Sequence, residues 1–329
     1  MERKALVISS FLAWSCSFAY AVTPAISHTN QPQKASLNSA STNAPMFKRL
    51  IPKFLYSYID FNFDSTTGPN FNRFQGHSNL YSAGADHIIL APNLFAGLYL
   101  FDIETSVDSQ TVLGPAGLVL SHTNIKNNTI FGHILKAFNQ NFYIDSAGAY
   151  GQNNISGVTQ LTPKPILGIS SSTNHNWFYS VNGIYRKNWR KVLIKASTGI
   201  LFNRVKSDTS YMFFQTENTP QMVKPLTNRA TYVMENLELG YSLSRTITPF
   251  INGGLIQVAD FANSRPIVNT VAIIGALPQL QLNQNAYRLG GGISLKLKLV
   301  TLRLEQKYYN AGGTFTSNDT LINLSCPFS

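Results

Sequence analysis

Polar and apolar side chains alternate along most of the chain after residue 54. In residues 287–297, for example, Tyr287, Leu289 and the other odd-numbered residues share one face, and Arg288 and the other even-numbered residues share the opposite face. Such alternation is typical of a strand, whose successive side chains point to opposite faces. The alternating segments run for about 10–15 residues, which exceeds an ordinary strand and suits a tilted bilayer crossing. The pattern predicts an all-β fold, a transmembrane antiparallel up-and-down β-barrel.

We predict about twelve strands within a barrel domain that spans residues 54–329. The connections between them alternate between short turns and loops of about 14–24 residues, as periplasmic turns and extracellular loops do in outer-membrane barrels. An even number of strands returns the C-terminus to the periplasmic side. The predicted strands are residues 54–64, 79–90, 94–105, 127–137, 141–152, 175–187, 190–205, 230–245, 247–262, 284–297, 299–312 and 319–328.

Composition supports a membrane barrel over the other classes. Charged residues make up 12% of the 329 residues, about half the share usual in soluble domains. Beyond the N-terminus no stretch is apolar enough for a membrane-spanning helix. Aromatic residues reach 12%, which is unusual for a disordered chain.

The N-terminus reads as a targeting segment followed by a tether. Residues 1–21 have a basic start, an apolar run and the small residues Ala19 and Ala21, which together predict a secretory signal peptide cleaved after Ala21. An uncleaved anchor is the alternative, but the apolar run is short for a span. Residues 22–53 contain no acidic residue and are rich in Ser, Asn and Thr. They predict a flexible basic tether.

Three segments resemble the translocator barrel of autotransporters. Residues 82–100 are similar to an early hairpin of that family, residues 143–151 to its fifth strand and residues 248–254 to the start of a later strand. The residues of the first segment that match the family pattern are Gly84, Asp86, Pro92, Asn93 and Gly97. The resemblance covers about residues 54–328 and implies a twelve-stranded barrel in the bacterial outer membrane.

Charged residues at inward-facing positions predict a lumen charge ladder. Equal numbers of acids and bases favour paired ladders over a filter of one sign, and hence weak ion selectivity. Barrel closure should bring Asp60 or Asp64 to Arg303 or Lys307. The assigned acids are Asp60, Asp64, Asp86, Asp145, Glu238 and Glu305, and the assigned bases are Arg186, Lys195, Arg288, Lys296, Arg303 and Lys307.

A periplasmic basic rim is predicted at the short turns. It consists of Lys136, Lys187, Arg190, Lys191, Arg245 and Lys298. Residues 1–21 carry one net positive charge, so the +11 of the whole chain becomes +10 after cleavage. The rim and the basic tether, Lys53 included, place this excess on one side of the membrane. Such residues attract anionic lipid head groups. The alternative is that they are snorkelling anchors with no partner beyond lipid.

Two further features indicate partners. Ile322, Leu324 and the penultimate Phe328 resemble the signal read by the barrel-assembly machinery, although an ordinary last strand would look alike. Residues 112–120 and 267–282 are unusually apolar. They predict loops folded over the barrel mouth, two extra strands, or a patch for a surface ligand or host partner. We expect outer-membrane lipids as partners and no nucleic acid.

Candidate chemistry is sparse. His87 and His133 lie on predicted strands, but no Ser–His spacing indicates a hydrolase, and no residue cluster suggests a metal or cofactor. Gly290 begins a run of three glycines that resembles a phosphate loop but lies within a strand, where it would let lumen groups approach the wall closely. We expect a non-catalytic surface or small-pore protein. The alternatives are a translocator that exports its short N-terminal segment and a lipid-modifying hydrolase.

Overall fold

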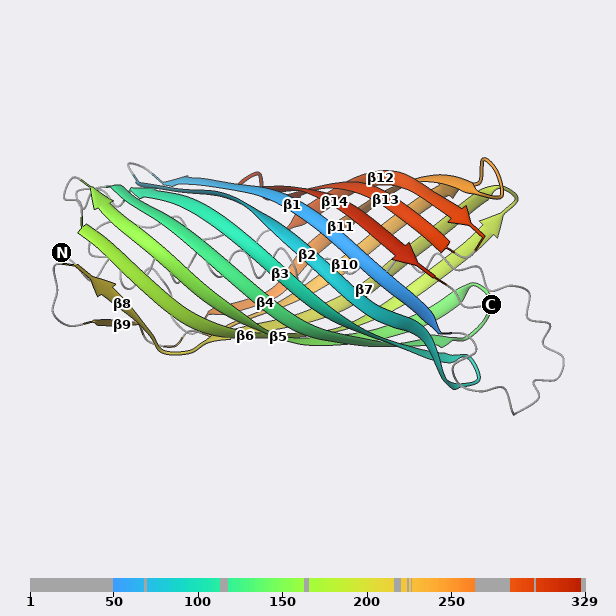
Figure 1. The fold of residues 1–329 in the computed structure, drawn as a ribbon. Helices are drawn as coiled ribbons and strands as arrows, with labels where there is room; N and C mark the ends of the chain where they lie inside the picture. Colours follow the sequence, from blue (N-terminus) through green and yellow to red (C-terminus); the bar gives the residue numbers. More distant parts are fainter. Residues whose placement is uncertain are drawn as a thin grey trace.

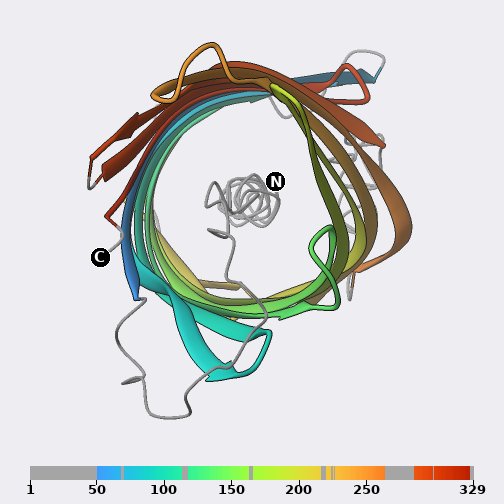
Figure 2. The ribbon, with the colours of Figure 1, turned by 90° about the vertical axis from the view of Figure 1, so that its right-hand side faces the viewer.

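The chain forms a closed antiparallel β-barrel in the computed structural model (Figures 1 and 2). The structure describes residues 50–326 apart from positions 68–69, 113–117, 163–165, 216–219, 224, 226, 264–284 and 299. The strands are β1 (Ile51–Thr67), β2 (Asn70–Ala91), β3 (Leu94–Val112), β4 (Leu118–Ala137), β5 (Phe142–Thr162), β6 (Ile166–Trp189), β7 (Val192–Ser207), β8 (Ser210–Phe214), β9 (Gln221–Val223), β10 (Thr227–Tyr241), β11 (Ile247–Asn263), β12 (Ala286–Leu297), β13 (Val300–Ala311) and β14 (Phe315–Ser325).

Twelve of these strands make the closed wall. Each pairs antiparallel with its neighbour along the chain, β7 pairs with β10, and β1 pairs with β14 to close the barrel. The short strands β8 and β9 pair with each other, and β8 adds to the extracellular end of β6. The predicted class and strand number are therefore confirmed. In the described part of the chain, no helix has the length and apolar character to cross a membrane.

The strands extend further toward the long loops than predicted. β2 has 22 residues and β6 has 24, so much of the predicted loops 65–78, 106–126 and 153–174 is strand. These extensions carry Ser, Thr and Asn on both faces and leave the membrane band, so the alternation that marks a lipid-facing strand fades. Residues 112 and 118–120 are strand, not loop. Residues 267–282 lie outside the described residues.

The outward face carries an apolar belt. Leu98, Leu100 and Ile130 are exposed although apolar, as lipid-facing residues are. Trp189 lies at the short-turn end of this belt and Trp177 near its other edge, where aromatic girdles meet the membrane surfaces. By the rule that periplasmic turns are short, the end that holds the β14 terminus is periplasmic.

The lumen wall has two halves of different chemistry. The extracellular half is uncharged in the described residues and contains buried Phe63, Phe74, Val107 and Val119, together with Ser, Thr and Asn side chains. The charged inward-facing residues all lie in the periplasmic half or at mid-height. This charged half is the candidate functional site.

Candidate functional site

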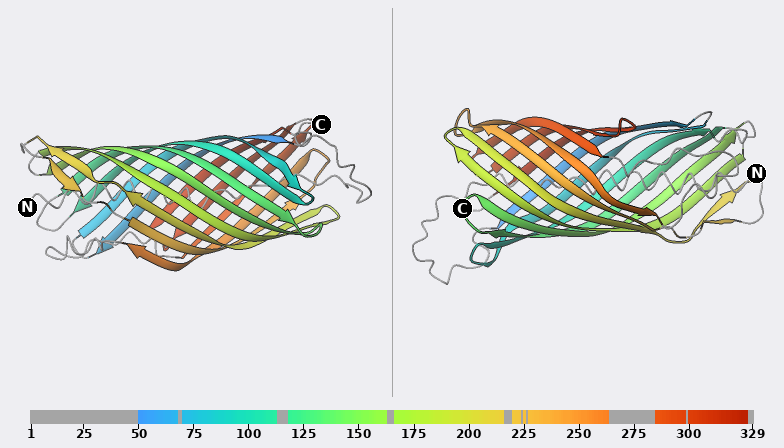
Figure 3. Two further views of the ribbon diagram at one scale, coloured as in Figure 1. Left: turned by 90° about the horizontal axis from the view of Figure 1, so that it is seen from below. Right: turned by 180° about the vertical axis from the view of Figure 1, so that it is seen from behind.

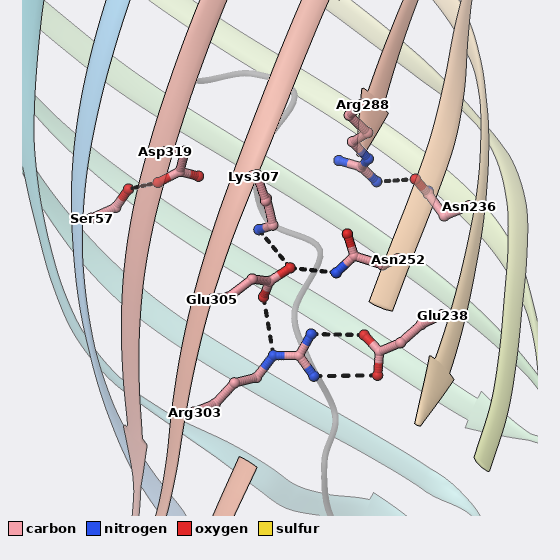
Figure 4. Close-up of polar contacts among 9 residues, drawn as sticks. All are labelled: Ser57, Asn236, Glu238, Asn252, Arg288, Arg303, Glu305, Lys307 and Asp319. Carbon is pink, nitrogen blue, oxygen red and sulfur yellow. Dashed lines mark hydrogen bonds and ion pairs between the residues drawn. The ribbon is translucent and has the colours of Figure 1, made fainter. Parts of the chain in front are cut away.

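Arg303 is the centre of the larger charged network, which lines β10 to β13 (Figure 4). Its Nη2 lies 2.8 Å from Oε2 of Glu238 and its Nη1 lies 3.2 Å from Oε1, so the guanidinium holds the carboxylate with both nitrogens. Its Nε donates to Glu305 at 3.0 Å. The guanidinium also lies 3.5 Å from the ring centre of Phe250. Paired and stacked in this way, the buried charge of Arg303 is fully compensated.

The network continues toward the extracellular side. Glu305 accepts a hydrogen bond from Asn252 and lies 3.5 Å from Nζ of Lys307. Arg288 on β12 donates to Asn236 on β10. Ser57 on β1 donates to Asp319 on β14, next to the strand that carries Lys307 (Figure 4).

Glycines on β11 and β12 make room for these long-range contacts. A Cβ at Gly254 would lie 2.3 Å from Oδ1 of Asn236, and one at Gly290 would lie 2.6 Å from Oδ1 of Asn252. A Cβ at Gly292 would lie 2.8 Å from the Phe250 ring. Side chains from strands that are not neighbours can therefore meet across the wall. As its position within a strand predicted, Gly290 lets a lumen side chain, here Asn252, lie close against the barrel wall.

A second charged cluster lies on the opposite wall, over β1 to β5. His133 Nδ1 lies 2.8 Å from Oδ1 of Asp145, and its Nε2 lies 3.1 Å from Oδ1 of Asp86. Lys53 Nζ lies 2.6 Å from the other oxygen of Asp86. His133 and Asp86 belong to β4 and β2, and they meet across β3 at Gly97, where a Cβ would lie 2.3 Å from Nε2 of His133.

A row of inward charges links the two walls. Arg186 on β6 is the register partner of Lys195 on β7, and Lys195 is the partner of Glu238 on β10. Two cations side by side are destabilising on their own, so Glu238 compensates both Lys195 and the nearby Arg303. The row brings together residues that the sequence predicted as separate members of one ladder.

Two predicted ladder residues face the other way. Asp60 and Asp64 lie on the outward face of β1, whereas Lys53, Ser57 and the other odd-numbered residues face the lumen. Asp64 pairs with Arg73 at 2.9 Å on the outer surface. The expected contact with Arg303 or Lys307 was therefore wrong. Side chains alternate between the two faces of a strand, and on β1 the even-numbered residues face outward.

Sequence reasoning did not assign three of the charged or titratable residues to the lumen. Lys53 was assigned to the tether, yet β1 begins at Ile51 and Lys53 is buried against Asp86. Asp319 on β14 and His133 on β4 both lie on the inward parity of their strands. The alternation of each strand, followed from its apolar lipid-facing residues, could have placed these residues in the lumen.

The remaining predicted residues lie at the periplasmic end or outside the described chain. Lys296 has inward parity but is exposed near the end of β12. The residues of the periplasmic basic rim are exposed at the short turns or beside them, and Arg190 has a left-handed backbone with φ 55°. Ile322 and Leu324 face outward on β14. Phe328, Ala19 and Ala21 lie outside the described residues.

Comparison with known proteins assigns the fold to a family. The family model "Autotransporter beta-domain" matches residues 59–305. The chain is similar to the translocator domain of the autotransporter NalP from Neisseria meningitidis, with a TM-score of 0.66, 11% identity, and coverage of 96% of this chain and 97% of that one. It is also similar to the transport unit of AIDA-I from Escherichia coli, with a TM-score of 0.58, 8% identity and 99% of each chain covered.

A third similar structure is the β-domain of the Bordetella autotransporter BrkA, with a TM-score of 0.54, 11% identity, and coverage of 84% of this chain and 98% of that one. A search of curated proteins finds no match to the chain. The family match covers most of the chain and agrees with the twelve-stranded closed barrel. The chain belongs to the autotransporter β-domain family and is a β-barrel protein of the bacterial outer membrane.

Proposed function

We propose that this barrel is a non-catalytic surface or small-pore protein of the outer membrane. The observation that carries the proposal is the mutual pairing of the lumen charges. Arg303 holds Glu238 and Glu305, and Lys53 holds Asp86. With most inward charges paired and only a small excess of bases, the lumen presents a polar path of low net charge, which favours passage of small solutes over binding of one charged substrate.

The arrangement around His133 supports the non-catalytic reading. Both ring nitrogens lie within hydrogen-bond distance of carboxylates, Asp86 on one side and Asp145 on the other. A histidine acting as general base needs one nitrogen turned toward the group that it deprotonates. In the described residues, no group of three or more His, Cys, Asp and Glu side chains could hold a metal ion.

Lipid hydrolysis tests this proposal. Refolded barrel in phospholipid vesicles should release no fatty acid above the level of empty vesicles. His133→Ala and wild type should be indistinguishable in this assay. Hydrolysis by the wild type that His133→Ala abolishes would favour the hydrolase alternative.

Export of the N-terminal segment is a second candidate function. It is favoured by the start of β1 at the periplasmic end, where Lys53 enters the lumen and binds Asp86. Residues 22–50 precede this point, and two of the similar proteins are named as a translocator domain and a transport unit. A protease site placed at residue 30 should be cut on intact cells if this segment is exported. Protection until the outer membrane is opened would exclude export.

We further propose that the periplasmic basic rim contacts phospholipid head groups of the inner leaflet. Each exposed cation near an anionic leaflet contributes about 1 kcal/mol, reduced by salt. Reversing the charge of Lys187, Arg190 and Lys191 together should weaken retention on anionic liposomes at low salt. Equal retention of variant and wild type would refute the lipid contact.

A further inference from the structure

Outward-facing charges above the apolar belt are paired on one side of the barrel. Asp64 pairs with Arg73 at 2.9 Å, and Glu104 pairs with Lys126 at 2.9 Å. His122 lies 2.7 Å from Asp108. On β1 to β4, then, each of these cationic or titratable groups faces an acid on the next strand, the cross-strand arrangement that stabilises a sheet.

The opposite side of the barrel places two arginines directly opposite each other. Arg204 on β7 and Arg229 on β10 are direct register partners, and the two strands run side by side in the wall (Figure 3). Both side chains face outward and are exposed. Lys206 lies one outward position beyond Arg204. Two like charges opposite each other are destabilising unless an anion lies between them. Arg229 also forms a 3.9 Å ion pair with the exposed Asp260 on the adjacent strand β11. For Arg204, no acid of the described residues lies within ion-pair distance, so the arginine pair keeps an uncompensated positive charge.

The height of the arginine pair matches the outer membrane surface. Arg204 lies twelve residues from the periplasmic start of β7 at Val192, and Arg229 lies twelve residues from the end of β10 at Tyr241. A tilted strand gains roughly 2.5 Å of height per residue, so the pair lies roughly 30 Å above the periplasmic end, just beyond an apolar band about 25 Å tall.

Exposed aromatic side chains lie beside and below the arginine pair. Trp177 on β6 is the register partner of Arg204, and Phe202 lies below it on the lipid-facing side. Aromatic rings at this level contact the boundary between sugar or glycerol groups and acyl chains. Arginine forks bind phosphate oxygens through two nitrogens, and the paired guanidinium groups can share one phosphate.

We propose that Arg204, Arg229 and Lys206 bind the phosphate of a phosphorylated glycolipid in the outer leaflet. The apolar belt below holds the acyl chains, while the arginine pair holds the head group. A membrane lipid is favoured over a free phosphate because Phe202 and Trp177 continue the site into the belt.

The test uses the refolded full-length mature barrel in neutral detergent. Diphosphorylated lipid A is titrated and bound lipid is counted by native mass spectrometry. The double variant Arg204→Gln/Arg229→Gln should bind about tenfold more weakly or worse. The matched control is Lys126→Gln, since Lys126 faces outward at a similar height but pairs with Glu104. It should bind as the wild type does, and heat-modifiable migration confirms that each variant is folded.

Two further arms identify the ligand. Dephosphorylated lipid A should bind the wild type as weakly as the double variant binds the phosphorylated form. Inorganic phosphate should compete only at concentrations far above that of the lipid. Equal weakening by Lys126→Gln and by the double variant would overturn the site, because it would reduce the effect to general surface charge. Full competition by inorganic phosphate at the concentration of the lipid would overturn the lipid as its occupant.

Discussion

Arg303 on β13 and Glu238 on β10 form a two-pronged ion pair although two strands separate them in the wall. Gly292 on β12 leaves room for the Phe250 ring, since a Cβ there would lie 2.8 Å from it, and the guanidinium stacks on that ring. A buried pair of this kind contributes less to net stability than to fixing the positions of its partners. It links β13 to β10 across the two intervening strands and compensates the buried charges of its two partners.

Separating the partners of this ion pair should destabilise the barrel. Arg303→Met or Glu238→Gln alone should each cost about 3–5 kcal/mol, because one buried charge loses its partner. The double variant should cost less than the sum, with a coupling energy of about 0.5–3 kcal/mol. Denaturant unfolding followed by circular dichroism measures this.

The exposed pair of Arg73 and Asp64 provides the control for that cycle. Arg73→Met should change stability by about 1 kcal/mol or less. If the lumen variants behaved like this surface variant, or if their effects were additive, the pair would have no structural role.

Gly97 should not tolerate a side chain. A Cβ would lie 2.3 Å from Nε2 of His133 and 3.1 Å from Oδ1 of Asp86, so Gly97→Ala must push the two apart and should cost about 1–3 kcal/mol. Gly132→Ala is the matched control, because its nearest neighbour atom would be 3.7 Å away. Equal unfolding midpoints for the two variants would show that His133 and Asp86 can move aside freely.

The placement of the lipid belt predicts a depth-dependent effect of charge. Leu100 on β3 faces outward near the middle of the belt, and Gln110 on the same strand lies well above it. Leu100→Lys should therefore destabilise the refolded barrel in lipid by about 2–4 kcal/mol, and Gln110→Lys by about 1 kcal/mol or less. The reverse order of the two effects would show that the belt is elsewhere on the wall.

Sequence reasoning found the barrel because the lipid-facing strands carry a strong period-two pattern. It missed the strand extensions because Ser, Thr and Asn occupy both faces there, and it gave Asp60 and Asp64 the wrong face. The alternation along β1 could have corrected that assignment. Phe54, Tyr56 and Tyr58 are even-numbered like Asp60 and Asp64, and they face lipid. The pairings themselves could not be predicted, since Arg303 with Glu238 and His133 with Asp86 depend on tertiary register and on glycine gaps in the intervening strands.

The C-terminal residues should matter for assembly in cells more than for stability. Ile322 and Leu324 lie on β14, which pairs with β1 to close the barrel. Removing Phe328 and Ser329 should lower the amount of folded protein in the outer membrane if the barrel-assembly machinery reads the end of this strand. Removing Ser329 alone is the control. Refolding of both forms in detergent should be similar, and equal levels in cells would contradict the proposed signal.

Ion selectivity is the property that follows most directly from a lumen of mutually paired charges. The inward acids of the described chain are Asp86, Asp145, Glu238, Glu305 and Asp319, and the inward bases are Lys53, Arg186, Lys195, Arg288, Arg303 and Lys307, with Lys296 at the rim. The decisive measurement is the reversal potential of the purified barrel in a planar bilayer under a salt gradient. Because the bases outnumber the acids only slightly, a conducting channel with a small reversal potential on the anion side of zero is the predicted result. A reversal potential close to the equilibrium value of the cation or the anion, or a membrane that stays silent, would contradict the proposed pore.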